Sequence, residues 1–209
     1  MKNLILPLIV FCFITTSHIE AQDLASAENT STLNYKKRHA IYDYKEARLN
    51  NTDTVPDFET KPNKLKITGT IYQNDGKTPA RDVIFFIHQP DETGNYTLKK
   101  DALKKRYVYH RAWIKTDADG AYTFYTFIPG SIEHSNDFKQ IHRSIKVPGK
   151  PEFNLDSYFF NDDPLIPNLS LSCRANFVKS MLKPEKVGDM YVAKMDIKLP
   201  KEAVEVNYK

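Results

Sequence analysis

The sequence predicts an all-β fold, an antiparallel β-sandwich with long loops and an N-terminal arm. After residue 62, short apolar segments of strand length are separated by Gly, Pro and Asp instead of by helical repeats. The 209 residues include 12 Tyr and 12 Phe, which supply enough aromatic surface for a hydrophobic core. The formal net charge is only +4, and this balance argues against a nucleic-acid partner.

The strand pattern is most regular in the first half of the sandwich. Alternating apolar residues over 65–71 indicate a half-buried strand, and a continuous apolar run over 83–88 indicates a second one. Five further strands are expected at 107–115, 121–127, 141–147, 153–160 and 191–199. Residues 117–120 read Asp-Ala-Asp-Gly, which predicts a tight hairpin turn between two of these strands.

The beginning of the chain is expected to be a secretory signal peptide, residues 1–21. Lys2 precedes an apolar run over 4–16 that is too short to span a bilayer, and cleavage is expected after Ala21. A lipoprotein anchor at Cys12 is the alternative, although bulky Phe11 directly before it argues against lipid attachment. The mature protein is therefore expected to be secreted or periplasmic, without a membrane-spanning segment.

Composition divides the mature chain into two parts. Residues 22–62 are rich in Ser, Thr, Asn and Asp and are expected to form an arm with a short helix, which either leads away from the membrane or lies across the domain, whereas 63–205 are expected to form the sandwich. Within the sandwich, 161–190 is expected to be a long loop with at most one or two helical turns around 177–182. Cys173 is the cysteine that remains after cleavage, so no internal disulfide is expected.

Several motifs follow one another in a fixed order along the sandwich. The segment LKITGTIYQNDGKTPARDVIFFIHQPDETGNY, residues 65–96, contains a strand, a DG turn and a final Gly-x-Tyr. It is followed by RAWIKTDADGAYTFYTFIPG at 111–130, by PGKPEFNLDSYFFNDDPLI at 148–166 and by a closing DIKL at 196–199. This series resembles the intradiol ring-cleavage dioxygenases, and the resemblance implies a prealbumin-like β-sandwich.

The resemblance also implies a chemistry. The family's reaction is the Fe(III)-dependent insertion of O₂ into a catechol, a small aromatic diol, between its two hydroxylated carbons. Two tyrosines and two histidines hold the iron, because a hard trivalent cation favours anionic oxygen and two phenolates supply it. Tyr96, at the end of Gly-x-Tyr, matches the first tyrosine, and His142 matches the second histidine of the family's His-x-His.

The other two ligand positions depart from the family. Ile132 stands where the second tyrosine is expected, and Gln140 stands where the first histidine is expected. An aliphatic chain does not bind iron, and a carboxamide is a much poorer donor to Fe(III) than an imidazole. Glu133 and His134 directly follow Ile132 and are candidate substitute ligands for iron or zinc, although a solvated loop is the ordinary interpretation of both.

Two functional hypotheses from different classes remain. In the first, an exported dioxygenase holds Fe(III) through Tyr96, His142 and substitute ligands, and Trp113 lines the pocket for the aromatic diol. In the second, catalysis has been lost, no cofactor is held, and the sandwich serves as an extracytoplasmic binding or structural module. His88, in a predicted strand, is interpreted as a hydrogen-bonded wall residue. The oligomeric state is left open.

Overall fold

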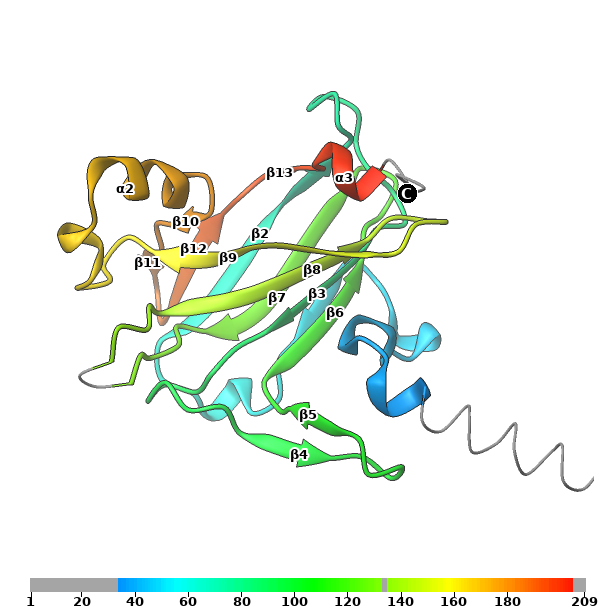
Figure 1. Cartoon of the computed structure of the whole chain (residues 1–209), viewed down its shortest axis with the longest axis horizontal. Helices are drawn as coiled ribbons and strands as arrows, with labels where there is room; N and C mark the ends of the chain where they lie inside the picture. The colour runs from blue at the N-terminus through cyan, green and yellow to red at the C-terminus, as the bar shows by residue number, and fades with distance from the viewer. Residues whose placement is uncertain (1–33, 133–134, 205–209) are drawn as a thin grey trace, which may run out of the picture. The chain divides into compact units, whose positions relative to one another are not determined.

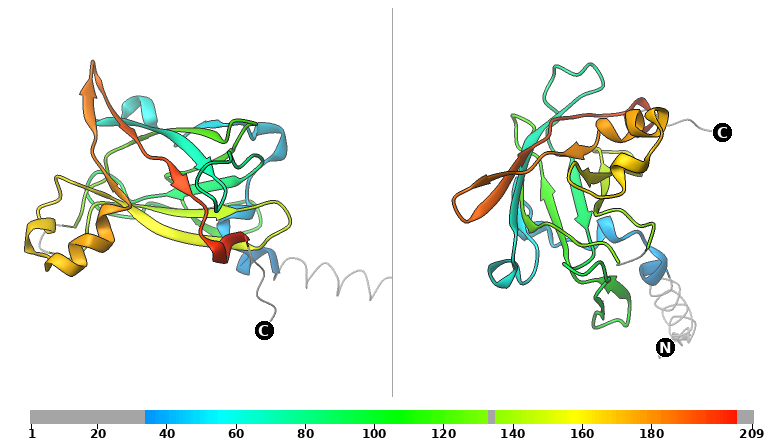
Figure 2. Two further views of the ribbon diagram at one scale, coloured as in Figure 1. Left: turned by 90° about the horizontal axis from the view of Figure 1, so that it is seen from above. Right: turned by 90° about the vertical axis from the view of Figure 1, so that its left-hand side faces the viewer.

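The computed structural model describes residues 34–132 and 135–204. Residues 34–37 are helical and belong to a separate unit, and the compact unit that carries the fold begins at Arg38. That unit consists of two facing β-sheets and a separate β-hairpin (Figures 1 and 2). Helices contribute only short segments: η1 (Ala40–Tyr42), η2 (Glu46–Arg48), η3 (Phe58–Thr60), η4 (Ile166–Asn168), α2 (Leu171–Val178) and α3 (Lys201–Val204). The predicted all-β sandwich is confirmed.

The strands are divided between the sheets as follows. The first sheet has the order β1 (Thr52–Thr54), β7 (Ala121–Phe127), β2 (Lys64–Tyr72), β12 (Met190–Lys194) and β11 (Glu185–Val187), and β13 (Ile197–Lys198) also pairs with β2. The second sheet has the order β10 (Met181–Leu182), β9 (Glu152–Phe160), β8 (Gln140–Lys146), β3 (Ile84–His88) and β6 (Arg111–Lys115). The hairpin consists of β4 (Leu98–Lys100) and β5 (Arg106–Val108).

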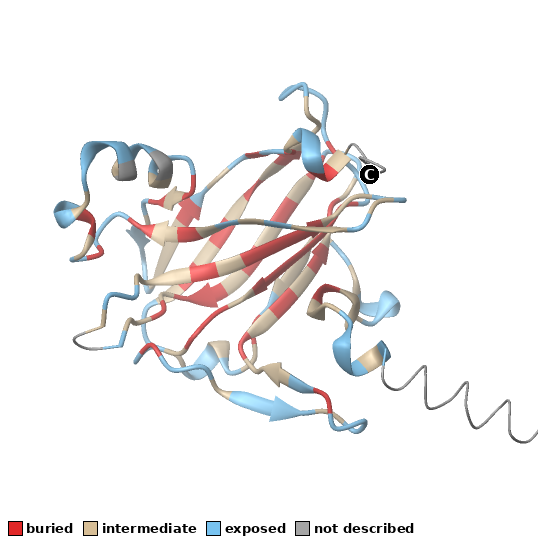
Figure 3. Ribbon diagram, in the orientation of Figure 1, coloured by how far each residue is buried: buried red, intermediate tan, exposed pale blue. Residues whose placement is uncertain are grey.

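The core lies between the two sheets, where alternate residues of β2, β6 and β7 are buried (Figure 3). In β2 the burial alternates along the whole strand, as the sequence pattern predicts for a strand with one solvated face. Phe85 of β3 contacts Tyr122 and Phe124 of β7 edge to face, with ring centroids 5.1 and 5.2 Å apart. Because each such aromatic ring contributes about 1.5–3 kcal/mol on full burial, this cluster joins the sheets strongly.

The turn at residues 117–120 connects the two sheets, so the predicted hairpin is wrong. The turn itself is tight: Asp117 accepts backbone N–H groups from Asp119 and Ala121, at 3.0 and 2.9 Å. However, β6 pairs with β3 and β7 pairs with β1 and β2. Both strands bury one face in the same core, through Ile114 and Phe124, and they do so from opposite sheets.

The sheets are mixed, whereas the sequence predicted antiparallel pairing throughout. The long central strands do pair antiparallel, but β1 runs parallel to β7, β10 runs parallel to β9, and β12 and β13 both run parallel to β2. These four strands have only two to five residues each. Such short strands carry little alternation, so their direction is set by the connections around them, which sequence periodicity does not reveal.

The predicted closing strand is divided into β12 and β13. Between them, the carbonyl of Met195 accepts a hydrogen bond from the buried Tyr122 hydroxyl at 2.5 Å, and Asp196 accepts the N–H of Thr70 at 2.9 Å. Gly69 permits this close approach, because a Cβ at that position would lie 2.1 Å from the Met195 carbonyl oxygen. Side-chain hydrogen bonds thus interrupt a strand whose sequence alternates without a break.

The predicted strand at 107–115 and the predicted loop at 161–190 also differ from the structure. The first is interrupted at residues 109–110, where the chain passes from the hairpin strand β5 to β6 of the second sheet. The second contains η4, α2, β10 and β11, so its helix begins earlier than the expected turns around 177–182. Within the described residues, no helix is long and apolar enough to cross a membrane.

Residues 38–62, which the sequence predicts to be an arm, lie against the sandwich. Ile41 of η1 is fully buried and contacts Ile84 and Phe86 of β3. Further along, β1 pairs in parallel with β7, and Val55 is buried in the main core. These two apolar residues anchor the segment, which covers part of the outer face of the second sheet.

Candidate functional site

The candidate site lies on the outer face of the second sheet. Phe85 and Ile87 point into the core, so the alternation of β3 directs Phe86 and His88 to the opposite face. Strand pairing then places His142 of β8 on one side of His88, and Arg111 of β6 on the other side. Three strands therefore bring side chains that are far apart in the sequence into one row.

The turn after β3 positions Tyr96. The carboxylate of Asp91 accepts the backbone N–H groups of Thr93 and Asn95, both at 2.9 Å, and so holds the turn closed. Gly94 has φ = +89°, and a Cβ there would lie only 2.4 Å from the backbone nitrogen of Ile132. Position 94 therefore requires glycine for two reasons: glycine adopts a positive φ readily, and it has no side chain to collide with Ile132.

The same turn contacts the Pro-Gly segment at 129–130. The N–H of Gly130 donates to the carbonyl of Asp91 at 2.9 Å, and a Cβ at Gly130 would lie 2.3 Å from the carbonyl oxygen of Glu92. The two glycine motifs thus fit against each other. Their contact places Ile132, which is 47% exposed, beside the turn that carries Tyr96.

Tyr96 and His142, the two matched ligand positions, are in contact. The Tyr96 hydroxyl lies 2.6 Å from Nε2 of His142, and Nδ1 of His142 lies 3.1 Å from the hydroxyl of Ser157. Burial lowers the pKa of His142, whereas burial and then the charge of Asp137 raise the pKa of Tyr96. At neutral pH the phenol therefore keeps its proton and donates to Nε2, and Nδ1–H donates to Ser157.

His88 extends this row on the other side of His142. Its ring is stacked between Phe86 and His142, with centroid distances of 5.4 and 4.7 Å. Burial, followed by the charges of His142, His39 and Arg111, lowers the pKa of His88 to about 3, so the ring is neutral at physiological pH. Its buried Nδ1 has no hydrogen-bond partner among the described residues, so the prediction of a hydrogen-bonded wall residue is wrong for that atom.

A cavity of about 220 Å³ lies beside His88. Its lining is mainly apolar and aromatic, and the residues are Ala40, Phe86, His88, Leu98, Arg106, Tyr107, Val108 and Arg111. They come from η1, from β3 and β6, and from the hairpin β4–β5. Cavities for drug-sized ligands measure roughly 300–1,000 Å³, so this smaller space suits a single ring.

The predicted ligand positions differ in the donor atoms that they offer to a metal ion. Tyr96 and His142 converge on one point, but Ile132 has no donor atom, and Gln140 offers only a carboxamide from the start of β8. Among the described residues, no three His, Cys, Asp or Glu side chains are grouped to hold a metal ion. The candidate substitutes Glu133 and His134 lie outside the described residues. Ligation by any of these residues remains a prediction.

Trp113 does not line the cavity beside His88. It lies on β6 opposite Phe86, and the two rings are 5.0 Å apart. Its indole N–H donates to the carbonyl of Ala40 at 3.2 Å. Trp113 is thus separated from His142 by Phe86 and His88, and it lines a different cavity, which is described below.

Sequence reasoning did not find Ser157 or the contribution of the hairpin. Ser157 reaches His142 because the pairing of β8 with β9 shifts register between Ile141 and Arg143, and such a bulge leaves no signature in the alternation. The hairpin strands β4 and β5 are three residues each, and β4 is exposed along its length. An amphipathic pattern is absent there, so only the tertiary structure shows that Leu98, Tyr107 and Val108 line a cavity.

Comparison with known proteins gives a likeness in structure alone. No family model matches the sequence, and no curated protein matches it. An intradiol ring-cleavage dioxygenase from Tetranychus urticae is similar in structure, with a TM-score of 0.59 and 16% identity over 79% of this chain and 92% of that one. The dioxygenase domain of a dioxygenase–carbohydrate-binding protein fusion from Streptomyces sp. SirexAA-E has a TM-score of 0.57 and 20% identity, over 75% and 92% of the two chains.

A 3-chlorocatechol 1,2-dioxygenase from Rhodococcus opacus 1CP is also similar. Its TM-score is 0.54 at 16% identity, over 74% of this chain and 67% of that one. These likenesses agree with the resemblance found in the motifs that end at Tyr96 and Gly130. The chain therefore has the fold of the intradiol ring-cleavage dioxygenases.

Proposed function

We propose that this protein is an exported member of the intradiol ring-cleavage dioxygenase family that binds a small aromatic diol without cleaving it. The export part of the proposal is supported by the leader-like residues 1–21. The family part is supported by the shared fold and by the ordered motifs. The binding part is supported by the cavity beside His88, and the loss of cleavage by the incomplete donor set.

One observation carries the loss of cleavage. The Tyr96 phenol and the His142 imidazole satisfy each other at 2.6 Å, while Ile132 and Gln140 occupy the two positions at which the family has its remaining iron ligands. Fe(III) needs anionic oxygen donors to offset its charge. Here burial raises the pKa of the one matched phenol. The retained pair therefore satisfies its own hydrogen bonds next to His88 and does not line the cavity that would hold the ligand.

The cavity beside His88 provides suitable chemistry for a neutral diol. Phe86, Leu98, Tyr107 and Val108 offer apolar and aromatic surface for the ring. The neutral His88 ring lines the cavity, and its buried Nδ1, which has no partner among the described residues, would accept a hydrogen bond from a phenolic hydroxyl after a small shift of the ring. A ligand that supplies this missing hydrogen bond gains affinity, because a buried polar atom without a partner is costly.

Calorimetric titration with catechol tests this proposal. We expect saturable binding to the wild-type protein and no consumption of O₂. His88→Phe keeps the stacked ring but removes the acceptor, and we expect it to weaken catechol binding by about fivefold to tenfold, the equivalent of one hydrogen bond. Toluene, which has no hydroxyl group, should bind equally to both proteins. Absence of saturable catechol binding, or an unchanged affinity in His88→Phe, would overturn the proposal.

Iron-dependent cleavage is the second candidate function, and the convergence of Tyr96 Oη and His142 Nε2 favours it. In this case Glu133 and His134 would complete the donor set, and the loaded protein would show the visible absorption of a tyrosinate bound to Fe(III). A double variant, Glu133→Ala with His134→Ala, would then lose its iron. Under the first proposal the same variant keeps full affinity for catechol.

A further inference from the structure

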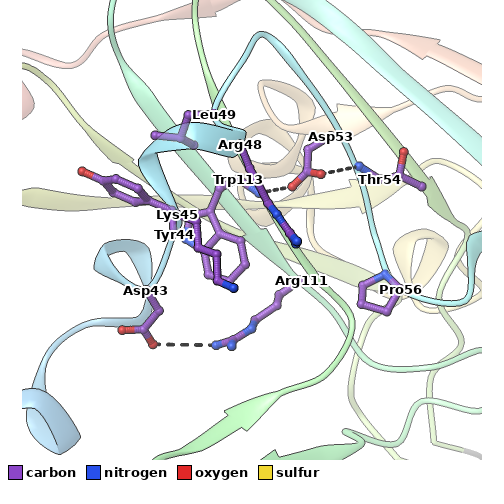
Figure 4. Close-up of a pocket in the computed structure, with 10 residues that line it drawn as sticks. All are labelled: Asp43, Tyr44, Lys45, Arg48, Leu49, Asp53, Thr54, Pro56, Arg111 and Trp113. Atoms are coloured by element: carbon purple, nitrogen blue, oxygen red, sulfur yellow. Dashed lines mark hydrogen bonds and ion pairs between the residues drawn. The ribbon is translucent and has the colours of Figure 1, made fainter. Parts of the chain in front are cut away.

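A second cavity lies on the other side of Arg111, beneath residues 43–56. Its volume is about 260 Å³, and its lining residues come from the segment around η2, from β1 and the residues after it, and from β6 (Figure 4). Arg111 lines both cavities, and its guanidinium lies over the rings of Tyr107 and Trp113, at 3.7 and 4.8 Å. This stacked arginine thus forms the wall between the two spaces.

The carboxylates of this second cavity are already engaged. Both oxygens of Asp43 accept hydrogen bonds from Lys105 Nζ at 2.8 Å. Asp53 accepts the backbone N–H groups of Trp113 and Thr54, both at 2.8 Å. Asp43 also pairs with Arg111, which lines the cavity, at 3.7 Å (Figure 4), so both acids already have partners within the protein.

Two of the three cations that line the cavity, Lys45 and Arg48, are in a different situation, whereas Arg111 is paired with Asp43. Figure 4 shows the side chains of Lys45, Arg48 and Arg111 gathered around the indole of Trp113. Lys45 and Arg48 form no ion pair within 4.0 Å of any residue in the described part of the chain. The charge of Arg48 does act on Asp53, where it offsets part of the rise that burial causes in the pKa of that carboxyl. The cavity therefore combines positive charge with an aromatic wall, and the Arg48 guanidinium suits a carboxylate or phosphate in particular.

The geometry points to a binding site for a small aromatic carboxylate in this second cavity. The carboxylate group would pair with Lys45 and Arg48, and the ring would pack against Trp113 beside the stacked Arg111. An anion without a ring would pair with the cations but would not pack against the indole of Trp113. The site should therefore bind benzoate more tightly than inorganic phosphate. This inference does not rest on the proposed function, because the two cavities have separate ligands and separate tests.

Fluorescence of Trp113 gives a direct readout, because this residue is the chain's single tryptophan. We expect titration of the full chain with benzoate to change its emission saturably, and added salt to weaken binding. The double variant Lys45→Gln with Arg48→Gln should weaken benzoate binding by about tenfold, the equivalent of one lost charge-assisted hydrogen bond. Both residues are exposed, so the variant should remain folded.

A matched control removes the same charge elsewhere. Lys186 in β11 and Lys183 just before it are also exposed and lie at the edge of the first sheet opposite β1, so Lys183→Gln with Lys186→Gln should leave the benzoate affinity unchanged. The inference is overturned if benzoate gives no saturable change, if the two double variants lose affinity equally, or if phosphate binds as tightly as benzoate. Catechol binding at His88 is measured separately, so either site can fail alone.

Discussion

The ammonium of Lys105 and the carboxylate of Asp43 form a buried ion pair that joins the hairpin β4–β5 region to the segment before η2. Nζ lies 2.8 Å from both carboxylate oxygens, and the two side chains are only 6% and 5% exposed. Lys105 also donates to the carbonyl of Arg38 at 2.9 Å. This pair fixes the segment that covers both cavities.

Loss of this pair should destabilise the protein markedly. Lys105→Met keeps most of the side-chain volume but leaves Asp43 without its main partner, so we expect the free energy of unfolding to fall by about 3 kcal/mol. The control is Arg81→Met, which removes the exposed pair with Asp82 and should cost about 0.5 kcal/mol or less. Urea unfolding measures both values. Equal losses in the two variants would contradict the structural role of Lys105.

Gly94 should tolerate no side chain. Gly94→Ala would strain a φ of +89° and would also bring Cβ within 2.4 Å of the Ile132 nitrogen. Gly149 has a similar φ of +72°, but its Cβ would meet open space, so Gly149→Ala isolates the conformational part of the cost. We expect Gly94→Ala to be about 2 kcal/mol less stable than Gly149→Ala. Similar stability of the two variants in thermal unfolding would rule out the close approach.

His88 should make the protein sensitive to mild acid. Its pKa is about 3 in the folded protein, below the ordinary value of about 6.5 in an unfolded chain. The unfolded chain therefore binds the proton more tightly, and the contribution of His88 to stability, complete above pH 6.5, is lost as the pH falls toward 3. Between pH 7.5 and 5, the wild type should lose about 1–2 kcal/mol more than His88→Phe. Parallel pH profiles would exclude this effect.

Ser157 should set the tautomer of His142. In the wild type we expect the proton on Nδ1, because Nε2 accepts from Tyr96. Ser157→Ala removes the partner of Nδ1, so the tautomer with the proton on Nε2 should gain population, which ¹⁵N NMR of the imidazole detects. Ser144→Ala is the control, because Ser144 bonds to Asn154 on the same pair of strands. An unchanged imidazole spectrum in Ser157→Ala would refute the assigned role.

The parts of the fold that the sequence predicts are those encoded by local patterns. The alternation in β2 occurs as predicted, and a tight Asp-Gly turn does form at Gly120, although it connects strands of different sheets and not a hairpin. The assignment of strands to sheets depends instead on residues far apart in the chain, because Ile114 and Phe124 share a core only in the tertiary structure. Residues 38–62 illustrate the same limit: two isolated apolar residues, Ile41 and Val55, anchor a segment whose composition is that of an arm.

In the candidate site too, some features follow from sequence motifs and others depend on the tertiary structure. Tyr96 and His142, which the motif order names as two ligand positions, lie in contact although they are 46 positions apart in the chain, and their role as ligands stays a prediction. The unpartnered nitrogen of His88 and the contact with Ser157 depend on strand register and a bulge. The second cavity depends on how residues 43–56 fold over Trp113, and no motif in the chain specifies that arrangement.

The most direct test of the central claim, that the site binds a diol but does not cleave it, is an oxygen-electrode measurement on iron-supplemented protein. The mature chain is expressed with added iron, its bound iron is quantified, and O₂ uptake is followed after catechol is added. We predict far less than one iron per chain and no uptake above the protein-free rate, while calorimetry on the same sample shows catechol binding. One bound iron per chain together with catechol-dependent O₂ uptake would contradict the account.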